Sequence, residues 1–329
     1  MRPALHPQLV NGRFGDPALF VERLHRRDAI LFDLGDLHAL SARDLLRVGH
    51  VFVSHVHMDH FIGFDALLRI LVGRERTVQI AGPEGLCDRV WHKLQAYEWD
   101  LAHRYATELI FDVTELGADA PLGAARFRFT CRFVREDLEP APPDAGEGLE
   151  LRWALLEHHG PCLGFAIAER AHANVWRNRL DDRGLPSGAW LQELKRAVLA
   201  GLPDDHRIML PDGDATPLGG LRDLVTLSRG QKLAYVTDVA DTPANRAAIA
   251  ALAEGADLFF LESRFAAADA DQARDRAHLT TRAAGEIARA AGVRRLEPFH
   301  FSPRYVREEE RLLAEVAAAF GATASSEAA

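Results

Sequence analysis

A cluster of metal-ligand residues near the start of the chain constrains its fold more than any other feature. His55, His57, Asp59 and His60 follow the apolar run 51–53 in the pattern His-x-His-x-Asp-His. Imidazole nitrogen and carboxylate oxygen are ligands that zinc and similar divalent metals prefer. Side chains two residues apart at an extended strand end point to the same side, so His55 and His57 can bind one ion together. Asp59 and His60 lie on the following turn and can bind a second ion. The cluster therefore predicts a two-metal site at a strand–helix junction.

Strand-like and helix-like runs alternate on both sides of the chain's middle, which predicts an α/β fold built from two similar halves. The expected strand–helix pairs are 51–54 with 61–71, 78–81 with a helix from about 84 to 97, 232–238 with 242–253, and 258–262 with 280–291. A further strand is expected at 127–133. We expect a single domain over residues 1–320 and a flexible polar tail over 321–329.

The segment 169–205 interrupts this alternation. It is polar and charged, and two glycine-containing breaks, 183–186 and 200–203, divide it. We expect this segment to be an insertion that leaves the core of the domain.

Three more candidate ligands stand where later strands are expected to end. His158 follows the strand-like run 149–156, Asp238 follows 233–237, and His300 follows 296–299. A lone residue of this kind at a strand end is more often a cap or a turn residue. Taken together with the first cluster, however, the three candidates favour a complete two-metal site, in which Asp238 is the natural bridge between the two metal ions.

Charge and hydropathy narrow the class of protein. The net charge of −9 argues against a globally basic nucleic-acid binder, although a local basic patch or a metal centre can still attract phosphates. The sequence shows neither an apolar stretch near the roughly 20 residues that span a bilayer nor a signal-peptide pattern, so we expect a cytoplasmic protein without a membrane partner. Cys87, Cys131 and Cys162 are expected to be reduced core cysteines.

Four stretches resemble, in order, the motifs of the metallo-β-lactamase superfamily, and within it those of ribonuclease Z, the tRNA 3′-processing endonuclease. They are the metal loop and helix start 52–64, the segment Glu157-His158-His159-Gly160-Pro161-Cys162-Leu163-Gly164-Phe165, the segment His278-Leu279-Thr280, and the segment Pro298-Phe299-His300-Phe301-Ser302-Pro303-Arg304-Tyr305. The likeness spans about residues 15 to 310. It implies a four-layer αβ/βα sandwich and two divalent metal ions, expected to be Zn²⁺.

The resemblance also assigns the ligands. Counting back from Gly164-Phe165, the family's histidine falls on His158 and not on His159. The first metal then takes His55, His57, His158 and Asp238, and the second takes Asp59, His60, Asp238 and His300.

The resemblance implies further roles near the metals. Asp59 orients or accepts the proton of the attacking water, and His278 is the candidate proton donor to the leaving oxygen; the simpler alternative for His278 is a solvent-facing residue at a helix start. Glu262 stands where the family has His-Glu-Ala-Thr, within Leu261-Glu262-Ser263-Arg264 here, and we expect it to support His278 or a metal-bound histidine, with a purely structural use as the alternative. Arg304 can contact phosphate or form an ion pair that secures the C-terminal helix.

The insertion 169–205 occupies the place of the family's tRNA-binding arm. Its stretch 185–195 resembles the arm's Gly-Pro segment, although Ala189 replaces the proline. Lys195 and Arg196 can contact phosphates, but the acidic residues between the basic ones also allow a self-paired surface.

The sequence thus predicts a dinuclear zinc-dependent phosphodiesterase, in the first place a ribonuclease Z-like endonuclease that cleaves tRNA 3′ trailers. The alternatives are a metallo-hydrolase of a small cyclic phosphodiester, lactone or thioester, and a protein that binds RNA without cleaving it. The full ligand set and His278 favour cleavage. The diiron relatives usually have Glu where this chain has His57, which disfavours a redox role. The expected partners are precursor tRNA, or else a small phosphodiester, and a second copy of the chain, because the family is often dimeric.

Overall fold

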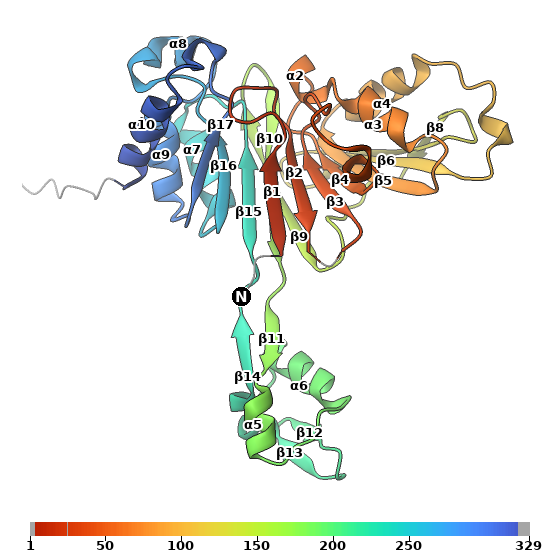
Figure 1. The fold of residues 1–329 in the computed structure, drawn as a ribbon, viewed down its shortest axis with the longest axis vertical. Helices are drawn as coiled ribbons and strands as arrows, with labels where there is room; N and C mark the ends of the chain where they lie inside the picture. Colours follow the sequence, from red (N-terminus) through yellow and green to blue (C-terminus); the bar gives the residue numbers. More distant parts are fainter. Residues whose placement is uncertain (1–3, 25, 322–329) are drawn as a thin grey trace, which may run out of the picture. The chain divides into compact units, whose positions relative to one another are not determined.

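The computed structural model describes residues 4–24 and 26–321 and divides them into two compact units (Figure 1). One unit contains the described residues up to Ile167 and those from Gln231 onward, and the other is Ala168–Gly230. Of the tail expected at 321–329, only Gly321 lies within the described residues.

The first sheet of the larger unit contains eight strands in sequence order. They are β1 (Leu5–Leu9), β2 (Leu19–Arg23), β3 (Ala29–Phe32), β4 (Val48–Phe52), β5 (Arg76–Pro83), β6 (Leu109–Leu116), β7 (Pro121–Arg128) and β8 (Arg135–Leu138). Strands β3 to β6 are parallel, and the outer pairs are antiparallel. The helices that connect the parallel strands are α1 (Ala42–Leu45), α2 (Met58–Phe61), α3 (Phe64–Leu71) and α4 (Leu86–Gln95).

The second sheet has the strand order β17-β16-β15-β10-β9. Its strands are β9 (Leu149–Glu157), β10 (Pro161–Glu169), β15 (Lys232–Val236), β16 (Leu258–Glu262) and β17 (Leu296–Phe299). Strands β15, β16 and β17 are parallel. The accompanying helices are α7 (Pro243–Ala253), α8 (Ala270–Asp275), α9 (Thr281–Ala290) and α10 (Glu309–Gly321).

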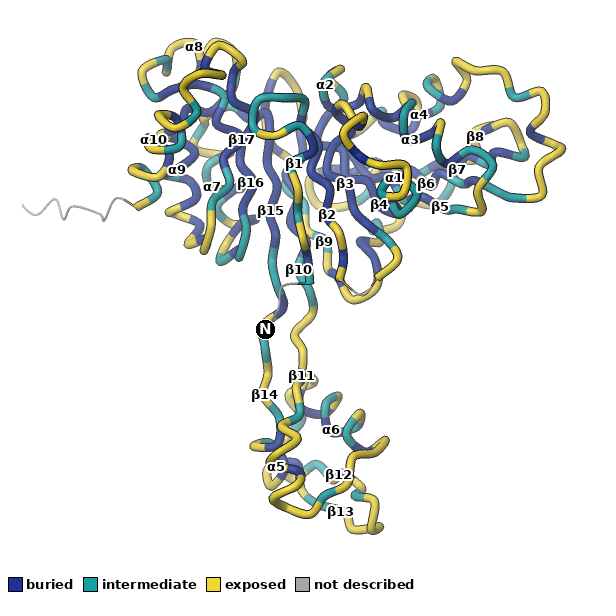
Figure 2. Tube along the Cα trace, viewed as in Figure 1, coloured by how far each residue is buried: buried dark blue, intermediate teal, exposed yellow. Residues whose placement is uncertain are grey.

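Strand β3 shows why these elements form four layers. All four of its side chains are fully buried, which requires cover on both faces of the strand. Successive side chains alternate between the faces: Ala29 and Leu31 pack in the apolar cluster that includes α3 and α4, whereas Ile30 and Phe32 pack between the two sheets. A third cluster joins the second sheet to α7 and α9. This order of helices, sheet, sheet and helices confirms the predicted αβ/βα sandwich, and Figure 2 shows the buried strands between more exposed helices.

Two predicted elements differ from the structure. The expected strand 127–133 ends early, because β7 stops at Arg128 and the chain turns, with positive φ at Arg132 and Phe133. Phe127, Phe129 and Phe133 still reach one apolar cluster, so a turn satisfies the same pattern as a strand. The expected helix 61–71 is divided at Gly63, where a Cβ would lie 2.1 Å from the carbonyl oxygen of Gly35.

The smaller unit has its own apolar cluster around Trp190, Leu194 and Ile208. Its elements are β11 (His172–Val175), α5 (Arg177–Asp182), α6 (Trp190–Leu199), β12 (Arg207–Met209), β13 (Ala215–Pro217) and β14 (Val225–Ser228). Strand β14 pairs antiparallel with β11. The segment expected as an insertion, 169–205, therefore lies inside a unit that continues to Gly230.

Within the described residues, the helices are too short or too polar to cross a membrane.

The three cysteines differ in burial, which corrects the expectation that all of them lie in the core. Cys87 and Cys162 are buried, but Cys131 is exposed. Burial raises the pKa of Cys87 to about 12 and that of Cys162 well above its usual range, so both thiols stay protonated at pH 8.

A disulfide-exchange reagent at pH 8 is therefore expected to modify one thiol per folded chain, and Cys131→Ser should abolish that reaction. Reaction of more than one thiol before unfolding would contradict this assignment.

Candidate metal centre

The histidine cluster lies between β4 and α2. His55 and His57 belong to the extended segment between them, and Asp59 and His60 belong to α2. His55 and His60 are buried, whereas His57 is exposed and Asp59 half-buried. His55 Nε2 lies 2.8 Å from His57 Nδ1, so two ring nitrogens converge on one point.

The remaining predicted ligands come from the second sheet and surround Asp238. Its Oδ2 lies 3.7 Å from His55 Nε2, 3.5 Å from His60 Nε2 and 3.7 Å from His158 Nε2. Its Oδ1 lies 2.7 Å from His300 Nδ1. The predicted ligands form two groups whose ligand atoms lie within 4.8 Å of one another: a first group of His55, His57, His158 and Asp238, and a second group of Asp59, His60 and His300. A third set within the same distance, Asp238, His278 and His300, shares two of these ligands and adds His278. The structure thus brings all seven predicted ligands together, with Asp238 between the groups.

Some residues of the site that lie at the ends of strands have a left-handed backbone conformation. Asp238 and His300 have φ values of 46° and 59°, and Asp33, directly after β3, has a φ of 57°. Residues other than glycine rarely adopt this conformation, and it costs on the order of 1 kcal/mol or more. Three residues with this conformation lie at strand ends beside one site. This indicates that the backbone strain serves to orient their side chains toward the site.

Asp33 is a site residue that sequence reasoning missed. Its fully buried carboxylate accepts hydrogen bonds from the Ser54 amide (2.7 Å), the Ser54 hydroxyl (2.8 Å) and the Tyr235 hydroxyl (2.8 Å). It also lies 2.9 Å from His60 Nδ1. A carboxylate at this distance holds the proton on Nδ1 and leaves the Nε2 lone pair for a metal. An acidic residue directly after the apolar run 29–32 was the available signal, the same one that pointed to Asp238.

Asp33→Asn is expected to weaken zinc affinity about 10- to 100-fold, the usual effect of removing a carboxylate that orients a ligand histidine. Competition with a chromophoric chelator measures this affinity. Asp36→Asn, a change at an exposed neighbour, is the matched control. Equal affinities of the two variants would show that Asp33 has a structural role only.

The donor set fits divalent metal ions. His60 Nε2 is buried and lacks a hydrogen-bond partner among the described residues. Burial and the neighbouring His60 lower the pKa of His55 to about 2, so its ring is neutral, the form that binds metals. Burial opposes the charge on Asp238, but His300 and His60 outweigh it and hold the pKa of this carboxyl well below its usual range. Neutral imidazoles around ionised carboxylates suit zinc and similar metals.

Asp238 and Asp33 have the opposite effect on His60. Burial disfavours its protonation, yet these two carboxylates raise its pKa well above the usual range. The protein therefore favours a positive charge at the His60 ring. Either a proton or a bound cation would supply this charge.

His278 and Glu262 form a buried pair beside the ligands. His278 Nδ1 lies 3.1 Å from both carboxylate oxygens of Glu262, which also accepts the Val239 amide at 2.8 Å. Only 8% of His278 is exposed, so it is not the solvent-facing residue of the simpler alternative. Its ring centroid is 4.8 Å from that of His158. His158 Nδ1 has a different partner, the Ala277 carbonyl at 2.8 Å, so Glu262 contacts His278 rather than this candidate ligand.

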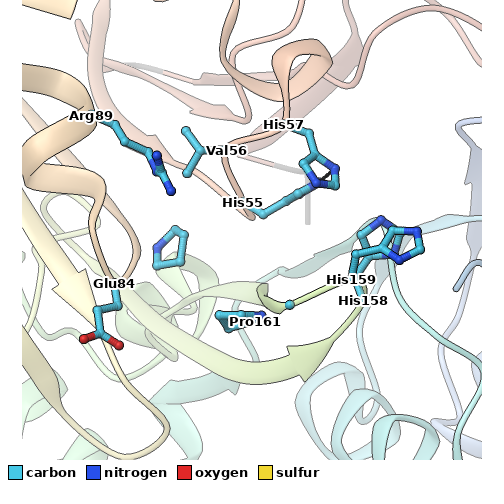
Figure 3. Close-up of a pocket in the computed structure, with 10 residues that line it drawn as sticks. His55, Val56, His57, Glu84, Arg89, His158, His159 and Pro161 are labelled. Carbon is cyan, nitrogen blue, oxygen red and sulfur yellow. Dashed lines mark hydrogen bonds between the residues drawn. The ribbon is translucent and has the colours of Figure 1, made fainter. Parts of the chain in front are cut away.

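A pocket of about 190 Å³ adjoins the first group of ligands (Figure 3). His55, His57, His158 and His159 line it on one side, and Glu84 and Arg89 stand across from them. Arg89 was not predicted, because no spacing in the sequence connects it with the histidines.

Comparison with known proteins identifies the family. Residues 213–301 match the beta-lactamase superfamily domain. Over 300 residues the chain is 32% identical to ribonuclease Z from Deinococcus radiodurans, an alignment that covers 88% of this chain and 87% of that relative. This chain belongs to the ribonuclease Z family.

A second relative agrees with this family assignment, and a solved structure agrees with the fold. Ribonuclease BN from Cronobacter sakazakii is 30% identical over 285 residues, covering 85% of this chain and 80% of the relative. The metallo-beta-lactamase fold protein YhfI from Bacillus subtilis shares the fold, with a TM-score of 0.54, 17% identity, and coverage of 95% of this chain and 92% of that one.

Arg304, one of the basic residues singled out in this ribonuclease Z family member, contacts residues other than the ligands. The Arg304 guanidinium donates to Gln272 at 2.6 Å and lies over the Phe265 and Tyr305 rings. Among the described residues it has a hydrogen bond and ring contacts rather than the ion pair that was one alternative. Lys195 and Arg196 are on α6 of the smaller unit.

Proposed function

We propose that this ribonuclease Z family member is a dinuclear zinc-dependent endoribonuclease that removes 3′ trailers from precursor tRNA. The observation that carries the proposal is the convergence of seven ligand residues, Asp238 among them, on one site, with the buried His278–Glu262 pair beside them. Relatives named ribonuclease Z support the substrate class.

The ligand residues divide into the two groups described above, and Asp238 would bridge them. Two bound ions would polarise the phosphodiester and make a water molecule nucleophilic at neutral pH. Asp59, half-buried at the edge of the second group, can hold a proton of that water. The neighbouring His300 lowers the pKa of Asp59, which keeps it ionised and able to accept. Glu262 fixes the His278 ring through Nδ1, so that Nε2 can deliver a proton to the leaving oxygen.

Further proposals concern the domain organisation, the location and the oligomeric state of the protein. We propose one metallo-β-lactamase-like domain with the unit Ala168–Gly230 as its insertion, which contacts the RNA through residues such as Lys195 and Arg196. We also propose a cytoplasmic location, where precursor tRNA is found, and a homodimer.

A small-molecule phosphodiesterase is the second candidate, and the smaller unit favours it. Two of its arginines form ion pairs within the unit: Arg183 pairs with Asp223 at 2.5 Å and Arg222 with Asp204 at 2.5 Å. Such paired residues attract RNA phosphates less than free ones.

Two assays on zinc-quantified protein distinguish these functions. One uses bis(p-nitrophenyl) phosphate, and the other uses a precursor tRNA with a 3′ trailer. We expect cleavage of both. Cleavage of the first substrate alone would leave a phosphodiesterase of small molecules, and binding of fewer than about two zinc ions per chain would contradict the dinuclear centre.

A further inference from the structure

An arginine side chain reaches into the second group of ligands. Arg264 follows β16 and is half-buried. Its backbone carbonyl accepts the Ser302 amide at 2.9 Å, which fixes this segment beside the loop that carries His300. Its Nη1 lies 2.6 Å from His300 Nε2.

In this contact, Arg264 is the hydrogen-bond donor and His300 is the acceptor. A guanidinium has N–H donors and no acceptor, so His300 Nε2 must accept with its lone pair. His300 Nδ1 faces Asp238 Oδ1, and Nε2 is 3.7 Å from Asp59 Oδ2, inside the second group. The lone pair that Arg264 occupies is therefore the one that the second group would offer to a metal ion.

The first group is different. Among the described residues, His55 contacts the Ser54 hydroxyl and the His57 ring, and His158 contacts the Ala277 carbonyl. None of these partners carries a fixed positive charge. Arg89 lines the adjoining pocket, but among the described residues it forms no hydrogen bond with a ligand of this group. Arginine remains charged at every physiological pH, and its charge a few ångströms from a dication is repulsive.

We propose that Arg264 competes with the metal ion for His300, so that the two halves of the centre load unequally. The group of His55, His57, His158 and Asp238 fills first, and the group of Asp59, His60 and His300 fills only when the metal displaces the guanidinium. Arg264 thus sets the zinc concentration at which the centre becomes dinuclear. This inference rests on the metal centre of the proposed function.

Calorimetric titration of the metal-free full-length protein with zinc tests the proposal. The unmodified chain is expected to bind in two steps, the second at least about tenfold weaker. Arg264→Thr should strengthen the second step about tenfold or more and leave the first unchanged. Arg264→Lys, which keeps the charge on a flexible stem without the planar fork, should lie between them. Arg274→Thr, at an exposed arginine paired with Asp271, is the matched control.

Three results would overturn the proposal. One is a single step with two equal sites in the unmodified chain. Another is an unchanged second step in Arg264→Thr. The third is a weaker second step in that variant, which would make Arg264 a support that orients His300. Absence of zinc binding would remove the metal centre itself, whereas the expected titration without RNA cleavage would leave this inference intact and contradict only the proposed function.

Discussion

Asp238→Ala is expected to lower cleavage of both phosphodiester substrates by at least about 10³-fold and to reduce bound zinc below one ion per chain. Among the residues that the structure describes, Asp238 is the one carboxylate whose oxygens lie within 4 Å of ligand nitrogens of both groups, from His55, His60, His158 and His300. Its loss removes the bridge and leaves the histidines without a shared negative charge. Elemental analysis of the dialysed protein and initial rates at saturating zinc measure the two effects.

Two further variants make the Asp238 result interpretable. Asp238→Asn keeps the shape of the buried side chain, so it separates loss of charge from a packing defect, and thermal unfolding should show that it remains folded. Asp275→Ala, a change at an exposed aspartate, should keep full zinc content and activity. Full zinc content in Asp238→Ala would show that the centre does not depend on this carboxylate.

His278→Ala is expected to slow cleavage of precursor tRNA by about 10²-fold or more while zinc content stays unchanged. The nucleotide oxygen that leaves during RNA cleavage needs a proton, whereas p-nitrophenolate is a weak base that leaves without one. The same variant should therefore lose much less activity on bis(p-nitrophenyl) phosphate. The ratio of the two losses isolates proton donation from any general damage to the site.

His278 could instead be a ligand, because its ring lies within ligand distance of Asp238 and His300. Loss of zinc from His278→Ala, or equal losses on both substrates, would then contradict the proton-donor role. Glu262→Gln should reproduce the substrate-dependent loss in weaker form, because it removes only the support of the ring. His103→Ala, at an exposed histidine, is the control.

The residues of the metal centre that could be predicted were those with a recognisable local sequence pattern. His55 to His60 form one contiguous motif, and His158, Asp238 and His300 each follow an apolar run whose end could be recognised. Residues that act through long-range register were not predictable in this way. Asp33 also follows an apolar run, but its role comes from its contact with His60, 27 positions away, and Arg264 gains its contact from the loop of His300.

The fold shows the same division between local and distant information. The alternation of strands and helices predicted an α/β fold of two similar halves, and the family resemblance implied its four layers. The structure confirms both, because each buried strand is covered on its two faces. The end of the smaller unit was not predictable, because β14 belongs to it only through pairing with β11, about fifty residues earlier. At Phe129 and Phe133 the apolar pattern was correct, but a turn and a strand could both satisfy it.

The split origin of the ligands has a consequence for how the protein matures. The first sheet supplies His55, His57, Asp59 and His60, and the second supplies His158, Asp238 and His300. On the ribosome, the early histidines emerge long before Asp238 and His300, so a partial chain offers only an incomplete, low-affinity site. The group of His55, His57, His158 and Asp238 is complete only after Asp238 has been synthesised, and the group of Asp59, His60 and His300 only after His300. A chain truncated before His300 therefore lacks the full two-metal centre.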